Sequence, residues 1–365
     1  MKWKRILAMI LAVASCLSLS VSASAANMTT RKATDFREFD RTAWYAEAVS
    51  AAVDNGLLYG KSSTIIDPNG DMTRAEMAAI INRSFGCYKT ADISQYEDVS
   101  KSKWYYKDVA LAVQMGTYNG RSASSMAPDA PISRQEAMTV VARALELDYD
   151  SYSKTDLSAF SDRSEISNWA LPYVRAMVGA DYIHVRTKGL EPLDNITRAE
   201  FAQIFHNIIG SYITVKGTYD KDIQGSVLIR TNEVMLKDMT VDGDLIIGCG
   251  AADGKITLDN VNIKGRLLVW GGGTKAVYCN NGTQMPEVVV ARVDGATKVI
   301  FDRDSTLAVI DTIKTRITER AKQNKETEII FYDVSGLRKA QKQLNAIVAG
   351  SQLSVVAPAH LYAIV

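Results

Sequence analysis

Two kinds of hydrophobic pattern divide the chain. As far as about residue 212, apolar residues recur at helical spacing, as in Met77, Ile80, Ile81 and Phe85, so that one stripe of each segment faces a core. Beyond Tyr212, Val, Ile, Thr and Gly alternate in short runs, which is typical of strands and turns. The pattern predicts a multidomain chain, mainly helical and then mainly β, with a boundary near residues 212–222.

A separate apolar run opens the chain. Basic residues at positions 2, 4 and 5 precede the run Ile6–Leu17, and small residues follow as far as Ala26, which predicts a secretory signal over residues 1–26. The run is shorter than the roughly 20 apolar residues that span a bilayer. The alternative is a lipoprotein signal with Cys16 acylated. Small residues continue past Cys16 to an Ala-x-Ala site, which favours the ordinary signal and an exported protein.

Three landmarks recur together. A tryptophan opens a helical pattern at Trp44, Trp104 and Trp169, at steps of 60 and 65 residues. A turn with a proline follows, and then a second helix start whose arginines lie 60 and 64 residues apart. These starts are Thr73-Arg74-Ala75-Glu76, Ser133-Arg134-Gln135-Glu136 and Thr197-Arg198-Ala199-Glu200. Each repeat is therefore predicted to be a helix, a loop and a second helix.

The arginine of each tetrad needs an explanation. The Thr or Ser and the Glu three residues later predict a capping box at the helix start. A cation in the first helical turn instead opposes the helix dipole, at a cost of about 0.3–1 kcal/mol at an exposed site. One account is an ion pair with a nearby carboxylate such as Glu76 or Asp71. The other is a seat for a carboxylate or phosphate, made by the guanidinium and the free N–H groups of the helix start.

The tryptophans allow two interpretations. They are core aromatics, or they lie at the edge of a groove and offer a ring face to the apolar side of a sugar. An aromatic platform beside an anion seat suits an acidic glycan.

These residues resemble the S-layer homology family, whose repeats carry an early acidic residue, a Trp in the first helix, a Gly-x-x-x-Gly loop and a Thr-Arg-Ala-Glu helix start. The resemblance covers about residues 36–213, as repeats 36–90, 91–150 and 151–213. The acidic residues are Asp40, Asp98 and Asp162, and the loop glycines are Gly56, Gly60, Gly116 and Gly120. In the third repeat, Asp181 and Val185 stand where the other repeats have glycine.

The resemblance implies a pseudo-threefold helical bundle whose inter-repeat grooves bind secondary cell wall polymer, typically with a pyruvylated terminal sugar. The glycan-binding residues that it implies are Trp44, Arg74, Gly60, Trp104, Arg134, Gly120, Trp169 and Arg198. Glycine permits positive φ or a close backbone approach. Because Asp181 adds bulk and negative charge near the anion seat, we rank the third site below the other two.

The β region carries a repeat of its own. Apolar and glycine positions from Leu236 to Ile247 recur 22 residues later, from Leu258 to Val269, which predicts coils of a β-solenoid over residues 222–305. Residues 306–365 are predicted to form a mixed α/β cap, with helices over 312–325 and 337–348 and strands near 328–333 and 353–356.

Catalysis is not indicated in the β region. Asp242, Asp244, Asp302 and Asp304 could be read as acid, base or calcium ligands. Asp-Gly-Asp is, however, ordinary turn chemistry, and the calcium-binding nonapeptide is missing. We expect no catalytic residue, no cofactor and no metal site.

The net charge and the cysteines bear on which partners the protein binds and on whether it forms a disulfide. The chain has a formal charge of +1, and removal of a signal with three cations leaves it near −2, which gives no nucleic-acid footprint. Cys87, Cys249 and Cys279 remain after the signal, without C-x-x-C spacing. Cys249 and Cys279 could pair outside the cell, or they could be buried single thiols.

Together these features predict a secreted protein that holds itself non-covalently on the cell wall and displays its β domain outward as a spacer, an assembly contact or an adhesive surface. Self-assembly at the surface is possible. The alternative is a wall-anchored carbohydrate-active enzyme with its chemistry in residues 222–365.

Overall fold

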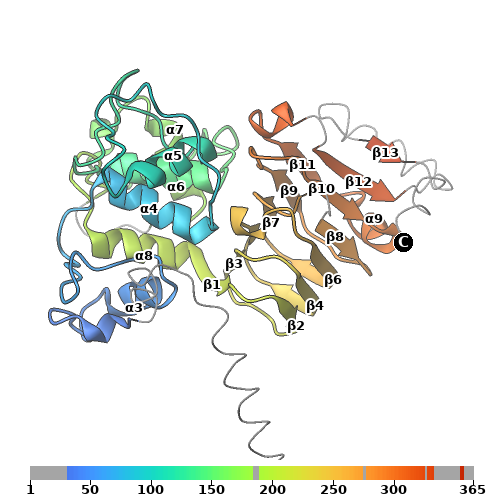
Figure 1. Ribbon diagram of the computed structural model, residues 1–365. Coiled ribbons are helices and arrows are strands. Elements are labelled where there is room, and N and C mark those ends of the chain that lie inside the picture. Colours follow the sequence, from blue (N-terminus) through green and yellow to red (C-terminus); the bar gives the residue numbers. More distant parts are fainter. Residues whose placement is uncertain (1–30, 184–188, 274–276, 325–326, 333–353, 357–365) are drawn as a thin grey trace, which may run out of the picture.

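The computed structural model describes residues 31–183, 189–273, 277–324, 327–332 and 354–356. A helical half and a two-sheet β half lie side by side (Figure 1). The expected change from helix to strand is therefore confirmed. No helix in the described part of the chain is long and apolar enough to cross a membrane.

Each repeat contributes two helices, as the pattern predicts. The pairs are α3 (Ala46–Asp54) with α4 (Arg74–Phe85), α5 (Tyr106–Met115) with α6 (Arg134–Ala144), and α7 (Leu171–Gly179) with α8 (Arg198–Ile208). Short 3₁₀ turns lie at η1 (Ala33–Asp35) and η2 (Arg163–Glu165). The second helix of each repeat packs on the first helix of the next, as α4 on α5, α6 on α7 and α8 on α3, so the three repeats close into a ring.

The centre of the ring is joined by backbone hydrogen bonds. Met72 N donates to Ile196 O, Ile196 N to Ile132 O, and Ile132 N to Met72 O, each at 3.0 Å. Each of these residues comes just before a tetrad, so the three second helices start around one axis. This pseudo-threefold centre fixes the position of every tetrad side chain.

The β half is a parallel two-sheet solenoid. Sheet I has the order β1-β3-β5-β7-β9-β11, and sheet II has the order β13-β12-β10-β8-β6-β4-β2. The strands of sheet I are β1 (Ile209–Ile213), β3 (Ser226–Ile229), β5 (Leu245–Ile247), β7 (Arg266–Val269), β9 (Glu287–Val290) and β11 (Lys314–Ile317). Those of sheet II are β2 (Gly217–Tyr219), β4 (Val234–Val241), β6 (Ile256–Ile263), β8 (Val277–Asn280), β10 (Lys298–Phe301), β12 (Glu328–Tyr332) and β13 (Ser354–Val356).

The strand register confirms the 22-residue repeat. Val234 pairs with Ile256 and Val241 with Ile263 in sheet II, while Leu245 pairs with Leu267 in sheet I. The two sheets run well beyond the clear coils, through β11, β12 and β13.

Two boundaries differ from the sequence prediction. The first strand starts at Ile209, directly after α8, whereas the third repeat was expected to reach residue 213 and the solenoid to start at 222. The helix predicted over 312–325 is wrong: Lys314–Ile317 is strand β11, followed by the 3₁₀ turn η4 (Ala321–Gln323). The free edge of β9 pairs with β11 and overrides the local helical pattern. The helix found nearby is α9 (Arg303–Val309), and 337–348 lies outside the described residues.

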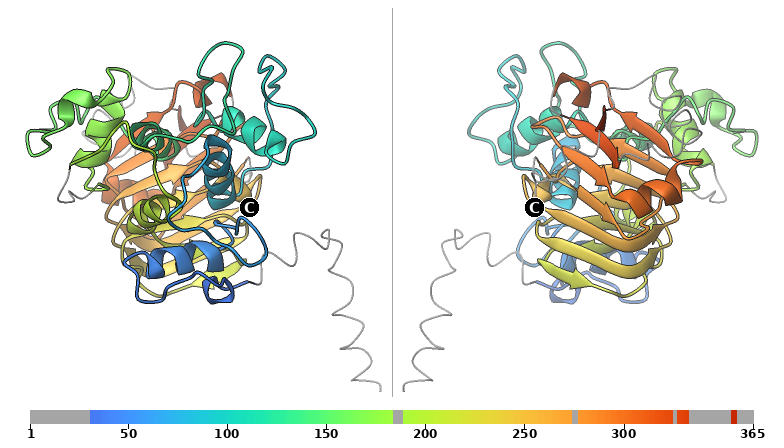
Figure 2. Two further views of the ribbon diagram at one scale, coloured as in Figure 1. Left: turned by 90° about the vertical axis from the view of Figure 1, so that its left-hand side faces the viewer. Right: turned by 90° about the vertical axis from the view of Figure 1, so that its right-hand side faces the viewer.

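The central strands of sheet I, β3, β5, β7 and β9, are buried on both faces. Val227, Leu245 and their register partners point into the solenoid core. The alternate row points to the helical bundle and belongs to its core: Leu228, Ile246, Leu268 and Val289, each fully buried. Continuous apolar runs are typical of such sheets. The views of Figure 2, from the helical side and from the solenoid side, show the bundle lying over this face.

Arginines of the solenoid also reach the C-terminal ends of the helices. Arg230 donates to the carbonyl of Arg83 in α4 at 2.9 Å, and Arg320 donates to that of Gln114 in α5 at 2.7 Å. Carbonyls in the last turn have no partner within the helix, and the helix dipole favours positive charge there. The solenoid therefore caps the base of the bundle as well as covering it.

Candidate functional site

The tetrad arginines form a ring of ion pairs between repeats. Arg74 Nη1 lies 3.0 Å from Glu136 Oε1, Arg134 Nη1 lies 2.9 Å from Glu200 Oε1, and Arg198 Nη1 lies 3.2 Å from Glu76 Oε1. Each arginine thus pairs with the capping-box glutamate of the following repeat. The ion-pair account holds, although the partner is not the carboxylate of the same repeat, and this pairing offsets the unfavourable dipole position.

Each arginine is also held by main-chain carbonyls. Arg74 donates from Nε to Met126 O at 2.9 Å and from Nη2 to Asn119 O at 3.2 Å, and its side chain lies 5.3 Å from the centre of the Tyr118 ring. Arg74 is only 5% exposed. Its first role is therefore to hold neighbouring repeats together.

The helix starts do not offer free N–H groups. The sequence-based hypothesis that these groups help to bind an anion is therefore wrong. Arg74 N donates to Ala130 O at 3.0 Å, and Ala75 N donates to Pro128 O at 2.9 Å. Thr73 Oγ1 accepts from Glu76 N in the expected capping box. The same pattern recurs at α6 and α8. The proline turn of one repeat thus satisfies the helix start of another.

One carboxylate per repeat holds that proline turn. Asp98 accepts from Met126 N at 2.9 Å and from Ala127 N at 2.7 Å. Ala127, just before Pro128, has a φ of 51°, a left-handed conformation that residues other than glycine seldom adopt. The two hydrogen bonds to Asp98 hold the backbone in this conformation. Burial favours protonation of Asp98, but the backbone bonds keep its pKa below the usual value.

The counterparts of Asp98 are Asp162 in repeat three and Glu38 in repeat one. Asp40, which the motif comparison placed in this role, instead accepts from Thr42 N at 2.8 Å within its own turn. The match in repeat one is therefore shifted by two residues.

Three grooves lie above the ion pairs. Grooves 1 and 2 draw on all three repeats, and the described lining of groove 3 draws on repeats two and three. Groove 1 has a volume of about 610 Å³ and is lined by Leu58, Tyr59, Gly60, Lys61, Thr73, Glu76, Ala79, Ile80, Arg83, Trp104, Asp108, Asp129 and Arg198. Groove 2, of about 530 Å³, is lined by Arg74, Thr117, Tyr118, Asn119, Gly120, Arg121, Glu136, Thr139, Val140, Arg143 and Trp169. Groove 3, of about 200 Å³, is lined by Arg134, Tyr182, Ile183, Gly189, Glu200, Gln203, Ile204 and Asn207.

The three tryptophans are exposed, so the core interpretation is wrong for them. Trp44 and Trp169 are each 51% exposed and Trp104 is 58% exposed. The buried aromatics are the following residues, Tyr45 and Tyr105, which meet their tryptophans edge to face at 5.5 Å. Trp104 lines groove 1 and Trp169 lines groove 2, while Trp44 is outside the described lining of groove 3.

The loop glycines have two distinct roles. Gly56 and Gly116 have φ values of 67° and 78°, and Asp181 takes the same left-handed conformation at 59°. The Asp181 substitution therefore preserves the backbone. Gly120 is needed for space, because a Cβ there would lie 2.5 Å from Ser122 O. Gly60 is equally crowded, and its counterpart Val185 lies outside the described residues.

Sequence reasoning missed a second set of cations in the grooves. Lys61 lies 2.7 Å from Glu76, and Arg121 lies 3.3 Å from Glu136. Arg143 lies seven residues beyond Glu136 on the same face of α6, and Arg83 occupies the same place on α4. Arg83 and Arg143 could have been found from the sequence, because each lies two helical turns beyond the tetrad glutamate on the same helix face.

Formal charge separates the grooves. In groove 2, three arginines face the single carboxylate of Glu136, which leaves a charge of +2. In groove 1, Asp108 and Asp129 join Glu76 and balance the three cations. In the described lining of groove 3, Asn207 stands where α4 and α6 have arginine.

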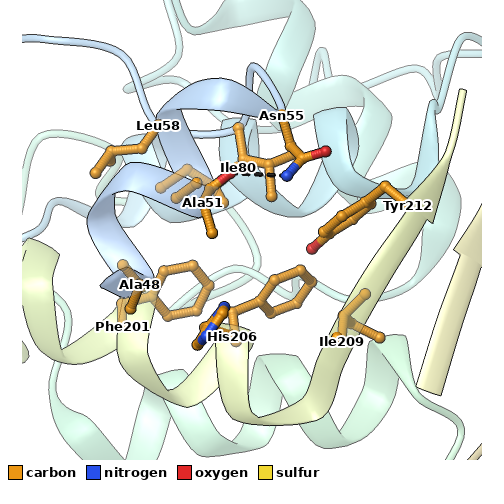
Figure 3. A pocket seen from close by; sticks show the side chains of 14 residues that line it. Ala48, Ala51, Asn55, Leu58, Ile80, Phe201, His206, Ile209 and Tyr212 are labelled. Carbon is orange, nitrogen blue, oxygen red and sulfur yellow. Dashed lines mark hydrogen bonds between the residues drawn. The ribbon is translucent and has the colours of Figure 1, made fainter. Parts of the chain in front are cut away.

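A smaller pocket lies where repeat three closes onto repeat one. Figure 3 shows Ala48 and Ala51 of α3 facing Phe201 and His206 of α8, with Tyr212 of β1 at one side. Its volume is about 40 Å³ and its lining is mostly apolar. It is a packing gap rather than a glycan site.

Three of the four solenoid aspartates considered for catalysis make contacts within the fold. Asp242 pairs with Lys264 at 2.6 Å, and Asp244 with Arg266 at 2.7 Å. Asp302 caps α9, and Asp304 is exposed in its first turn. Within the described ranges, no group of three or more His, Cys, Asp or Glu side chains could hold a metal ion.

Comparison with known proteins agrees with the repeats. The S-layer homology domain model matches residues 39–78, 95–138 and 159–202. A surface-layer 125 kDa protein of Lysinibacillus sphaericus is 28% identical over 319 residues, which cover 84% of this chain and 26% of that protein. An alignment of this extent necessarily includes solenoid strands.

Other relatives are of two kinds. The S-layer protein sap of Bacillus anthracis is 26% identical over 41% of this chain and 17% of its own length. An endoglucanase of a Bacillus species (strain KSM-635) is 24% identical over 56% of this chain and 22% of its own length. The chain thus spans about a quarter or less of the length of these relatives. With the ring of repeats and the family match, the chain is a secreted cell-surface protein that contains three tandem S-layer homology domains.

Proposed function

We propose that groove 2 binds an acidic glycan of the cell wall and thereby anchors the protein without a covalent bond. The ligand that fits best is secondary cell wall polymer with a pyruvylated sugar. The observation that carries the proposal is the exposed ring of Trp169 in a groove with a formal charge of +2. An apolar platform and excess cations suit a sugar that carries a carboxylate.

Arg121 and Arg143 are the groove 2 cations that remain accessible to a ligand. The side chain of Arg121 is 44% exposed, and its contacts to Glu136 are long, at 3.3 Å. Arg143 lies 4.9 Å from the centre of the Tyr173 ring and 3.4 Å from its hydroxyl. Arg74 is buried and makes four hydrogen bonds to three residues, Met126, Glu136 and Asn119, so it shapes the groove floor and adds charge.

Groove 1 is the second candidate, because Trp104 is exposed and Lys61, Arg83 and Arg198 are present. Its acidic residues weaken attraction for an anion. Groove 3 ranks last because its described volume is smaller and because Asn207 replaces the arginine that grooves 1 and 2 have at this position. The solenoid, on this proposal, is displayed with the anchor, and no catalysis is assigned to it.

The test is retention on purified cell wall sacculi. Arg143→Gln combined with Trp169→Ala should lower retention at least tenfold at low salt, and the equivalent change in groove 1, Arg83→Gln with Trp104→Ala, should lower it less. Lys103→Gln, at an exposed cation outside the grooves, is the matched control. Far-UV circular dichroism checks the fold of each variant.

Sacculi treated with mild acid to remove pyruvyl ketals provide a second arm. Loss of binding to treated sacculi supports recognition of the pyruvyl carboxylate by the groove. Binding that survives this treatment removes the pyruvyl group from the proposal, and undiminished retention of the groove 2 variant refutes the site.

A further inference from the structure

Two thiols from opposite halves of the molecule face each other. Cys87 follows Gly86, the C-cap of α4, and Cys249 opens the 3₁₀ turn η3 (Cys249–Ala251) at a solenoid corner. Their Sγ atoms are 3.1 Å apart although 162 residues separate them in the chain. Cys279 lies inside the solenoid core, whereas Cys249 packs against the bundle core, so the pairing of Cys249 with Cys279 considered from the sequence is excluded.

The backbone around both thiols is closely fitted. A Cβ placed on Gly86 would lie 2.9 Å from Gly250 Cα, and one on Gly250 would lie 2.3 Å from Arg230 O. The guanidinium of Arg230 in turn donates to Arg83 O near the end of α4. Glycine next to each cysteine lets the two segments touch, and Arg230 joins them on one side. The facing thiols are therefore held by the packing of the two halves.

We propose that Cys87 and Cys249 form a disulfide in the exported protein, which joins the helical anchor covalently to the solenoid. The bond would close a loop of 162 residues that crosses the direct junction of α8 with β1. Export supplies the oxidising setting in which such bonds persist.

The chemistry is a thiol–disulfide exchange with an external disulfide such as glutathione disulfide. The Cys249 thiolate attacks the oxidant and releases its first thiol, and the Cys87 thiolate then attacks the Cys249 sulfur and releases the second. Two protons and two electrons leave the cysteines, and the oxidant becomes two thiols. A hydrogen bond to Cys249 and burial raise the pKa of the Cys87 thiol, so less of it is thiolate. The second step is favoured instead by geometry, because the two Sγ atoms are 3.1 Å apart.

The experiment uses the full chain, exported and purified without reductant, then trapped with N-ethylmaleimide under denaturing conditions. Mass spectrometry should find one cross-linked peptide pair that contains Cys87 and Cys249, with Cys279 alkylated. If both cysteines are alkylated, the protein is equilibrated with glutathione disulfide before a second trapping. Alkylation of both residues after that step overturns the proposal.

Stability gives an independent readout. Dithiothreitol should lower the urea midpoint of the wild-type chain, and Cys87→Ser and Cys249→Ser should each have the lowered midpoint without further response to reductant. Cys279→Ser is the matched control, because it should keep the response. A response that persists in Cys249→Ser would contradict the link. None of these results depends on glycan binding, so the proposed function stands or falls separately.

Discussion

Trp270→Ala would remove the largest side chain between the helical bundle and the solenoid. Trp270 follows β7 and is 2% exposed. Its indole N–H donates to Ala144 O at the end of α6 at 3.1 Å, and its ring meets Phe85 edge to face at 6.3 Å. It belongs to the same apolar core as Leu268 and the bundle helices. The substitution therefore opens a cavity shared by both halves.

The expected cost is about 3–5 kcal/mol, the usual range for truncation of a buried Trp or Phe to Ala. Trp270→Phe should cost about 1–3 kcal/mol, because it keeps most ring contacts but leaves the Ala144 carbonyl without its donor. Urea unfolding measures both values. Hydrogen exchange followed by mass spectrometry shows where protection is lost, and we expect α4, α6, β5 and β7 to lose it together.

Trp104→Ala is the matched control, since the same residue type is removed from an exposed position and should change stability by less than about 0.5 kcal/mol. If Trp270→Ala lowered protection in the solenoid and left α4 and α6 unchanged, the two halves would unfold independently. That result would refute the reasoning from a shared core.

Three further predictions concern the repeat ring. Arg74→Met should lower stability by about 3 kcal/mol because it removes a buried ion pair and leaves main-chain acceptors unpaired, and thermal melting would show no loss if the ring were dispensable. Burial opposes ionisation of Glu76, but Lys61, the Thr73 N–H and Arg198 lower its pKa, so its contribution is present above about pH 4.5 and lost as the pH falls through the lowered pKa. Urea midpoints between pH 7 and 3 should therefore fall more steeply for the wild type than for Glu76→Gln, and parallel curves would contradict this. Gly120→Ala should destabilise the groove 2 loop by about 1–3 kcal/mol and reduce sacculus retention, since the new methyl lies 2.5 Å from Ser122 O; unchanged melting and retention would show that the loop can move aside.

Much of the fold could be predicted from interactions between residues close together in the sequence. The capping boxes at Thr73, Ser133 and Thr197 involve atoms three residues apart, so the tetrads alone predicted where the second helices begin. The 22-residue repeat could be recognised in the sequence because register partners such as Val234 and Ile256 lie on the same face of a sheet and are both apolar. The repeats and the family resemblance followed from the same short-range patterns.

Long-range packing decided the rest. Each tetrad arginine pairs with a glutamate 62, 66 or 122 residues away, and no local pattern tells that the partner belongs to the next repeat. Ring closure also places proline-turn carbonyls on the helix starts, which removes the free N–H groups expected there.

Most helices and strands, and both repeats, were thus predictable from the amino-acid order, because hydrogen bonds and side-chain periodicity act over a few residues. The exception is Lys314–Ile317, which pairs as a strand where a helix was predicted. Three features follow from long-range packing alone: the face of sheet I that meets the bundle, the position of the tryptophans outside the core, and the contact of Cys87 with Cys249. Those outcomes depend on how apolar surfaces far apart in the chain exclude water together.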